Sequence, residues 1–213
     1  MLSDLLGWVE PWYRFRRRLG RRRGRARDLA KVRATGGRMT AAECEALYDL
    51  AREAKDGCIV EIGTFRGKST VACALGARAG GGARVWAVDP FIPFVGACGG
   101  RFGPGDKVAL LRNLLLADVA EQVWMLHAPS TQAAAGWREP IALLWLDGDH
   151  TYEAVRSDLD AWAPFVVAGG TVAFHDSLDP ALGPRRLIEE LLARGGWERV
   201  RVVDTLTVLR KTA

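Results

Sequence analysis

The sequence is poor in several features that mark out particular classes of protein. It has 4 cysteines in 213 residues, none in a Cys-x-x-Cys spacing, so neither a disulfide framework nor a zinc site is predicted. Its apolar runs all fall short of the ~18 residues that a membrane-spanning helix needs. The N-terminus lacks the positive and then apolar pattern of a secretion signal. We therefore expect a cytoplasmic protein in a reducing compartment.

Positive charge is concentrated at one end of the chain. The formal net charge is +5, yet twelve of the 30 basic residues lie between Arg14 and Arg38, where Asp28 is the only acid. Without this stretch and the two acids that precede it, 18 basic residues (30 − 12) and 22 acidic residues (25 − 3) remain, a net charge of −4. We therefore divide the chain into a basic, aromatic N-terminal arm, residues 1–39, and one domain over residues 40–213.

The arm combines apolar and aromatic side chains with arginines. The apolar residues come first and are Leu2, Leu5, Leu6, Trp8, Val9, Trp12, Tyr13 and Phe15. This composition suits a segment that makes peripheral contact with an anionic membrane or an acidic partner. A solvated helix, or one packed on a second copy of the chain in a homodimer, accounts for the same residues. Nucleic acid is a less favoured partner.

A turn with two glycines follows the first expected strand, residues 58–62. Glu61 lies near the end of this strand, and Gly63 and Gly67 allow a ligand to approach the backbone closely. Three residues separate the glycines, whereas a phosphate-binding loop has four before Gly-Lys-Ser and a dinucleotide turn reads Gly-x-Gly-x-x-Gly. An acid repels phosphate but attracts an ammonium group, such as that of S-adenosylmethionine (SAM). The alternative is an ordinary tight turn.

A second acid, Asp89, ends the next expected strand, residues 84–89. A carboxylate at this position usually accepts two hydrogen bonds from the ribose hydroxyls of a bound nucleotide. An Asp before a proline is also a common turn former. The two acids with a helix between them favour the cofactor interpretation.

Strands and helices alternate along the domain, which predicts an α/β fold with a mostly parallel sheet covered on both faces. The last two strands are joined by almost no loop, so they must be antiparallel, because a parallel connection needs a crossover of about a dozen residues. The expected strands are 58–62, 84–89, 122–127, 141–146, 170–175, 198–204 and 206–210, and the expected helices are 68–79, 106–117, 130–136, 151–163 and 183–194, after a helix capped by Thr40 with Glu43 in a capping box.

Acids and imidazoles gather where the fourth and fifth expected strands end. Asp147, Asp149 and His150 follow the fourth strand, and His175 and Asp176 follow the fifth. Because neighbouring parallel strands end ~5 Å apart, Asp147 and Asp176 can meet around one cation, and oxygen ligands suit Mg²⁺. The alternative is that these residues only cap helices and turns.

Residues 40–210 resemble class I SAM-dependent O-methyltransferases. More narrowly, they are similar to a bacterial family with the motifs Val-Glu-Ile-Gly-Thr-x-x-Gly-x-Ser, Asp-Gly-Asp-His-x-Tyr and Gly-Gly-x-x-x-x-His-Asp. In this chain the motifs run from Val60 to Ser69, from Asp147 to Tyr152 and from Gly169 to Asp176. The resemblance implies a Rossmann-like three-layer sandwich whose seven-stranded sheet has an antiparallel last strand.

Relatives that modify antibiotic sugars, catechols or caffeoyl-CoA imply roles by motif position. Asp89 would bind the ribose of SAM, and Ser130 would contact adenine, although a helix cap is an equal expectation for Ser130. The methionine end of SAM is assigned to Glu61, Gly63, Gly67 and, at its carboxylate, Ser69.

The same relatives imply the catalytic groups. Their metal site is acid, acid and Asn, whereas this chain has Asp147, His175 and Asp176, a departure that leaves the metal and the need for one open. Three residues after Asp147 the relatives carry a lysine base, and this chain carries His150. Imidazole titrates near neutrality, so His150 is the expected general base, with His175 as a ligand, a base or an orienting group.

The expected activity is methyl transfer from SAM to a hydroxyl of a small molecule, and the resemblance alone implies a sugar or glycoside. This in-line displacement needs no covalent nucleophile. An RNA methyltransferase that uses the basic arm and a non-catalytic cofactor-binding scaffold are the alternatives. The glycine-rich loop 90–105, with Phe91, Phe94 and Phe102, is expected to be either a lid over the substrate or an ordinary surface loop.

Overall fold

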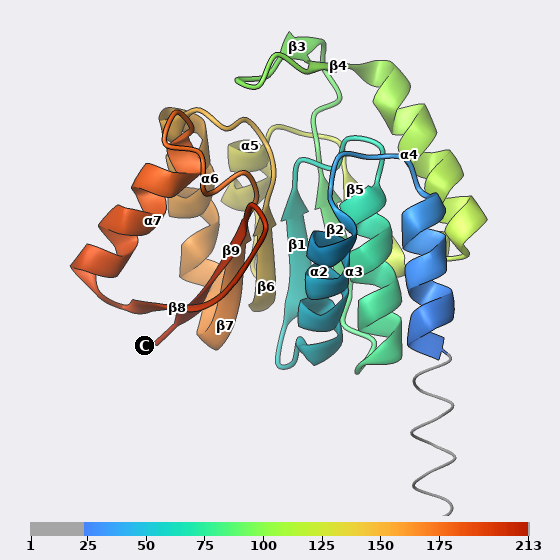
Figure 1. The fold of residues 1–213 in the computed structure, drawn as a ribbon, viewed down its shortest axis with the longest axis horizontal. Coiled ribbons are helices and arrows are strands. Elements are labelled where there is room, and N and C mark those ends of the chain that lie inside the picture. The colour runs from blue at the N-terminus through green and yellow to red at the C-terminus, as the bar shows by residue number, and fades with distance from the viewer. Residues whose placement is uncertain (1–23, 213) are drawn as a thin grey trace, which may run out of the picture.

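The computed structural model describes residues 24–212 (Figure 1). The apolar part of the arm therefore lies outside the described residues, and its expected contacts stay predictions. None of the helices in residues 24–212 is long and apolar enough to cross a bilayer.

The central sheet has seven strands in the order β5-β2-β1-β6-β7-β9-β8. All neighbouring pairs are parallel except β7–β9 and β8–β9, so the last strand in the sequence is the one that runs against the others. This confirms the Rossmann-like α/β fold and the antiparallel terminal pair. The strands are β1 (Cys58–Ile62), β2 (Val85–Val88), β5 (Val123–Leu126), β6 (Ile141–Leu146), β7 (Val166–Phe174), β8 (Trp197–Val203) and β9 (Leu206–Lys211).

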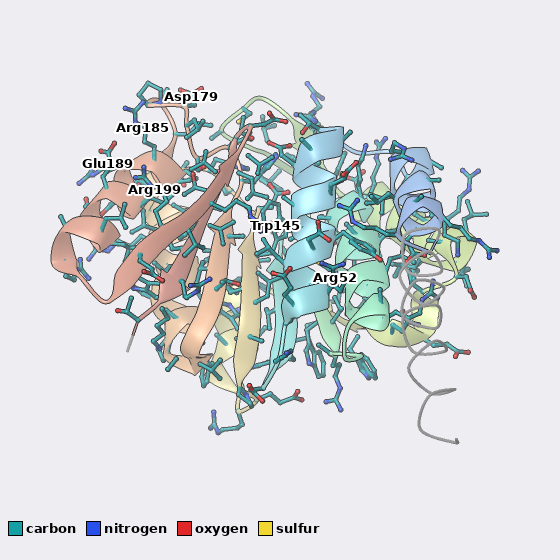
Figure 2. The ribbon with its side chains drawn as sticks, turned by 60° about the horizontal axis from the view of Figure 1, so that its bottom comes forward. Arg52, Trp145, Asp179, Arg185, Glu189 and Arg199 are labelled. Carbon is teal, nitrogen blue, oxygen red and sulfur yellow. The ribbon has the colours of Figure 1, made fainter. Side chains whose placement is uncertain are left out.

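Helices cover both faces of the sheet and give three layers (Figure 1). Side chains alternate along a strand, so Ile59 and Val60 of β1 enter two different cores. Figure 2 shows Trp145 of β6, which is fully buried, between the sheet and α2. One core includes α2 (Ala41–Glu53), α3 (Lys68–Ala79) and α4 (Pro104–Ala117), and the other includes α5 (Ser130–Ala135), α6 (Tyr152–Trp162) and α7 (Gly183–Arg194).

Part of the predicted arm packs on the domain. Residues 24–34 form a helix whose Leu29 and Val32 are buried in the core with α2, α3 and α4. Its Lys31 Nζ donates to the carbonyl oxygen of Ala117 at 2.7 Å. The helix is followed in the chain by α2. The capping box predicted between Thr40 and Glu43 is present at the start of α2.

Two expectations about the secondary structure were wrong. Strand β7 begins at Val166 rather than at residue 170, because Val166 pairs with Ile141 of β6 across a register shift. The glycine-rich loop contains a two-stranded sheet, β3 (Phe94–Val95) with β4 (Arg101–Phe102), which stands above the carboxyl edge of the main sheet (Figure 1). This small sheet forms part of the site described below.

Gly63 is needed by the protein's own packing. Its φ is +84°, and a Cβ there would collide with the backbone of Asp147 and Gly148. We expect Gly63→Ala to lower the free energy of unfolding by about 2–4 kcal/mol, from the left-handed backbone and the collision together. Urea denaturation measures this change. Gly81→Ala, where the added Cβ meets nothing within 4 Å, is the control and should change stability by less than ~0.5 kcal/mol. Equal losses in both variants would contradict the packing argument.

Candidate active site

Two adjoining cavities lie at the carboxyl edge of the parallel strands. The first, of about 460 Å³, is called here the Asp89 pocket, and the second, of about 270 Å³, the His150 pocket. Their shared lining is Phe65, Phe102, Asp147 and Gly148. A cavity of about 520 Å³ lies elsewhere, at the amino-terminal edge around Gly57 and Arg84, away from every motif residue.

Backbone hydrogen bonds continue past the strand ends and align the site residues. The amide of Asp147 donates to the carbonyl oxygen of Ile62 at 2.9 Å, and the amide of His175 donates to that of Leu146 at 3.1 Å. Asp176 has a φ of +48°, which an Asp tolerates better than most residues. The ends of β1, β6 and β7 are thus held in register at the two pockets.

Asp89 joins the loops that follow β1 and β2. Its Oδ2 accepts hydrogen bonds from the amides of Thr64 at 2.9 Å and Phe65 at 3.3 Å, and its Oδ1 accepts one from Phe91 at 2.8 Å. The carboxylate still lines the pocket named after it. The Asp89 carboxylate is therefore held in place by the backbone amides, as a hydrogen-bond acceptor at the end of β2.

Ser130 lines the Asp89 pocket but does not cap α5, because Pro129 holds the cap position. Its hydroxyl accepts a hydrogen bond from Trp162 Nε1 at 2.8 Å. Beside it lies Asp158, where burial outweighs the hydrogen bond with Ser130 and raises the carboxyl pKa to about 6. Sequence reasoning missed Asp158, although an acid three residues after buried Val155, on the apolar face of α6, was a usable signal.

Glu61 lies beneath the pockets rather than on their walls. Its side chain is 0% exposed, and the Ser69 hydroxyl donates to its Oε1. Burial raises the pKa of Glu61 to about 8, although the hydrogen bond from Ser69 acts in the opposite direction. Ser69 itself lines the His150 pocket. The predicted methionine-end residues therefore lie together, with Ser69 between Glu61 and the cavity.

Gly67, like Gly63, is required by the packing of the protein itself, in addition to its predicted contact with a ligand. It caps α3 with a φ of +85°, and a Cβ there would collide with Leu110 of α4. Gly63 lines the Asp89 pocket. Both glycines thus let the loop after β1 fold tightly against its neighbours.

His175 lies between carboxylates on two sides. Its Nδ1 is 3.0 Å from Asp147 Oδ1 and 3.6 Å from Asp176 Oδ2, and its Nε2 is 3.5 Å from Glu43 Oε2. Burial alone would lower the pKa of His175, but the neighbouring carboxylates outweigh it and raise the pKa to about 11. The ring is therefore an imidazolium at neutral pH.

Glu43 is a site residue that sequence reasoning recognised only as part of a capping box. Its carboxylate accepts hydrogen bonds from the amides of Thr40 and Thr205, both at 2.9 Å. Burial opposes its ionisation, but His175, Thr205 and Thr40 overcome that effect and lower the pKa of Glu43 to about 2. Only the fold brings the start of α2 to the end of β7, so the sequence carried no signal for this contact.

His150 lies between Asp147 and Asp176 and lines the His150 pocket. Its Nε2 is 3.5 Å from Asp147 Oδ1 and 3.4 Å from Asp176 Oδ2, and its side chain is 14% exposed. The carbonyl oxygen of His150 accepts a hydrogen bond from the amide of Gly183 at 2.8 Å, which ties the loop to α7. The alternative that Asp149 or His150 caps α6 was wrong, because Thr151 does so.

The aromatic residues of the glycine-rich loop have different places. Phe102 stacks on Phe94 at 4.7 Å between ring centroids and meets Phe65 edge-on at 5.3 Å. Phe94 and Phe102 line the Asp89 pocket, and Phe102 also lines the His150 pocket. Phe91 is 5% exposed and belongs to the core, so the expectation of a lid residue was wrong for Phe91.

The comparisons with known proteins identify the family of the chain. A family model described as a methyltransferase domain matches residues 60–177, more than half of the chain. The chain belongs to this family and is a SAM-dependent methyltransferase.

Solved structures of low sequence identity share the fold. Cofactor-bound Rv0187 from MTB is 20% identical over 88% of this chain and 89% of that one, with a TM-score of 0.66. The O-methyltransferase NovP is 23% identical over 81% of each chain, with a TM-score of 0.61. CalS11, a TDP-rhamnose 3'-O-methyltransferase, is 19% identical over 79% of this chain and 76% of that one, with a TM-score of 0.58.

Proposed function

We propose that the chain transfers the methyl group of SAM to a hydroxyl of a small molecule, a sugar or glycoside, with His150 as the general base. The observation that carries this proposal is the position of His150 between Asp147 and Asp176, in a cavity that adjoins a second one lined by Asp89 and Ser130. One cavity would take the adenosine part of SAM, and the other would take the acceptor.

The cofactor would lie across the ends of β1 and β2. Asp89 would accept hydrogen bonds from the ribose hydroxyls, and Ser130, beside Asp158, would contact adenine. The methionine end would turn past Gly63 toward Ser69, which lines the second cavity. Glu61 would orient the Ser69 hydroxyl, because its own side chain is buried and accepts the hydrogen bond from Ser69.

The reaction is an in-line displacement that the chain aligns. The acceptor oxygen attacks the methyl carbon, the carbon–sulfur bond breaks with its electron pair going to sulfur, and S-adenosylhomocysteine leaves. The hydroxyl proton passes to His150. His175 is unsuited to that task, since its two ring nitrogens face carboxylates and it already carries both protons at neutral pH.

A divalent cation is a further part of the proposal. Asp147 and Asp176 line the acceptor cavity and offer the oxygen ligands that Mg²⁺ prefers. The groups whose ligand atoms lie within 4.8 Å of one another are Asp147 with His150 and His175, and Asp176 with His150 and Cys98, so the two carboxylates would have to approach each other to share one ion. Bound Mg²⁺ would lower the pKa of the acceptor hydroxyl. His175 fits the predicted ligand role less well, because Glu43 and Asp147 already engage its nitrogens.

The acceptor class rests on two supports. CalS11, which shares the fold, acts on a sugar nucleotide according to its name. The proposed acceptor cavity has a polar wall of carboxylates and imidazoles, which suits a molecule with several hydroxyls. The homodimer and the membrane contact of the arm stay predictions.

The cofactor assignment is tested by calorimetry with SAM. We expect the wild type to bind SAM and Asp89→Asn to bind it about 10–100-fold more weakly, because the ribose loses a charged acceptor worth about 1.5–3 kcal/mol. Asp160→Asn, on the exposed face of α6, is the matched control and should bind like the wild type.

An acceptor screen then separates an enzyme from a scaffold. Methylated product should form from a hydroxylated acceptor, and chelation by EDTA followed by added Mg²⁺ tests the cation. Absence of SAM binding would overturn the proposed function, and binding without any product would favour the scaffold.

A further inference from the structure

The His150 pocket is lined by two basic side chains that have no role in the proposed reaction. Arg38 and Lys68 line the same cavity as His150, His175 and Asp176. Within residues 24–212, the ion pairs of arginine and lysine side chains involve Arg25, Arg52, Arg66, Arg78, Arg84, Arg156, Arg185, Arg186 and Arg210, and not these two.

The acids of the cavity pair with its imidazoles and not with these two cations. Glu43 and Asp147 are engaged by His175, and Asp176 lies beside both imidazoles. The cavity therefore has one side on which three carboxylates meet two imidazoles, and another on which Arg38 and Lys68 have no ion-pair partner among the described residues.

Lys68 belongs to the cofactor side of the cavity. It is the first residue of α3 and precedes Ser69, to which the cofactor carboxylate is assigned. Its aliphatic stem lies against Gly37, where an added Cβ would come within 2.6 Å of Lys68 Cβ. A role of Lys68 toward the carboxylate of SAM accounts for its charge.

Arg38 belongs to the acceptor side. A Cβ added to Gly100 would lie 3.2 Å from Arg38 Nη1, so the guanidinium rests on the turn between β3 and β4. The same turn carries Cys98, whose sulfur lies within 4.8 Å of ligand atoms of His150 and Asp176. Arg38 is thus placed at the part of the cavity where the acceptor would bind.

We propose that the acceptor carries a negatively charged group, a carboxylate or a phosphate, and that Arg38 binds it. This inference rests on the proposed function, because it concerns the molecule that His150 deprotonates. A guanidinium presents a planar fork of donors that matches both kinds of oxyanion, and such charged hydrogen bonds are stronger than neutral ones. Arg38 would select an anionic sugar over a neutral one and set its orientation.

The test uses the full chain saturated with S-adenosylhomocysteine, so that the cofactor site is filled. Calorimetry measures binding of glucose 1-phosphate, glucuronate and neutral methyl glucoside. We expect the wild type to bind at least one of the two anions more tightly than methyl glucoside, and the anion preferred tells phosphate from carboxylate.

Arg38→Ala should weaken that binding by about 10–100-fold, and Arg38→Lys should retain part of it. Arg33→Ala, an exposed arginine on the helix of residues 24–34, is the matched control and should bind like the wild type.

Two results would overturn the inference: neither anion binds better than methyl glucoside, or Arg38→Ala binds the preferred anion as tightly as the wild type does. Failure of S-adenosylhomocysteine to bind would instead reject the proposed function. The two failures are therefore distinguishable.

Discussion

Replacing His150 by alanine is expected to lower turnover by about 10²–10⁴-fold and to leave the affinity for SAM unchanged. The variant loses the group that accepts the hydroxyl proton, whereas the Asp89 pocket, which His150 does not line, keeps its walls. Single-turnover kinetics gives the first quantity and calorimetry the second. His150→Gln keeps a polar side chain of similar reach but cannot act as a base at neutral pH, so it should be nearly as slow.

His127→Ala is the matched control for this experiment. The two nitrogens of His127 lie 2.9 Å from Lys107 Nζ and 2.9 Å from the carbonyl oxygen of Pro90, and the residue lines neither pocket. Its turnover should stay close to that of the wild type. If His150→Ala turns over at the wild-type rate, His150 is not the base.

The second large effect is expected on stability. Glu61→Gln should raise the free energy of unfolding by about 3–5 kcal/mol at about pH 8.5 and by much less at about pH 5. A carboxyl that is fully buried, with a pKa raised from 4.5 to about 8, disfavours the folded state once the unfolded chain ionises. Gln keeps the oxygen that accepts the hydrogen bond from Ser69 but carries no charge.

The sign follows from the two pKa values of Glu61. Below pH 4.5 the carboxyl is protonated in both states, and the wild type carries no penalty. Between pH 4.5 and about 8 the unfolded chain releases the proton while the folded protein keeps it, so the penalty grows. Above about pH 8 the penalty is constant.

Thermal and urea denaturation across this pH range measure the effect of Glu61→Gln. Glu53→Gln, at the exposed end of α2, is the control and should show no such pH dependence. A stability difference for Glu61→Gln that is the same at about pH 5 and at about pH 8.5 would show that ionisation of Glu61 is not its cause.

Local sequence patterns predicted most of the fold. Strand 58–62 and helix 68–79 have the predicted bounds, because a short apolar run and a glycine before a helix are properties of short stretches. The antiparallel terminal pair followed from the length of its loop alone. The start of β7 was missed, because a pairing across a register shift depends on the neighbouring strand.

The candidate site divides in the same way. Asp147, His150, His175 and Asp176 were predictable, since the carboxyl ends of parallel strands must meet at one edge of the sheet. Asp158 had a signal that was overlooked.

What the sequence determined by itself is the order of the elements, the direction of the last strand and the set of acids and imidazoles at the carboxyl edge. Only the tertiary structure decided that Glu43 contacts His175 from the other side, that Glu61 is buried behind Ser69, and that Arg38 lines the His150 pocket. The reason is physical: periodicity and turn chemistry act between residues close in the chain, whereas these features depend on how separate elements pack against one another, which no local pattern records.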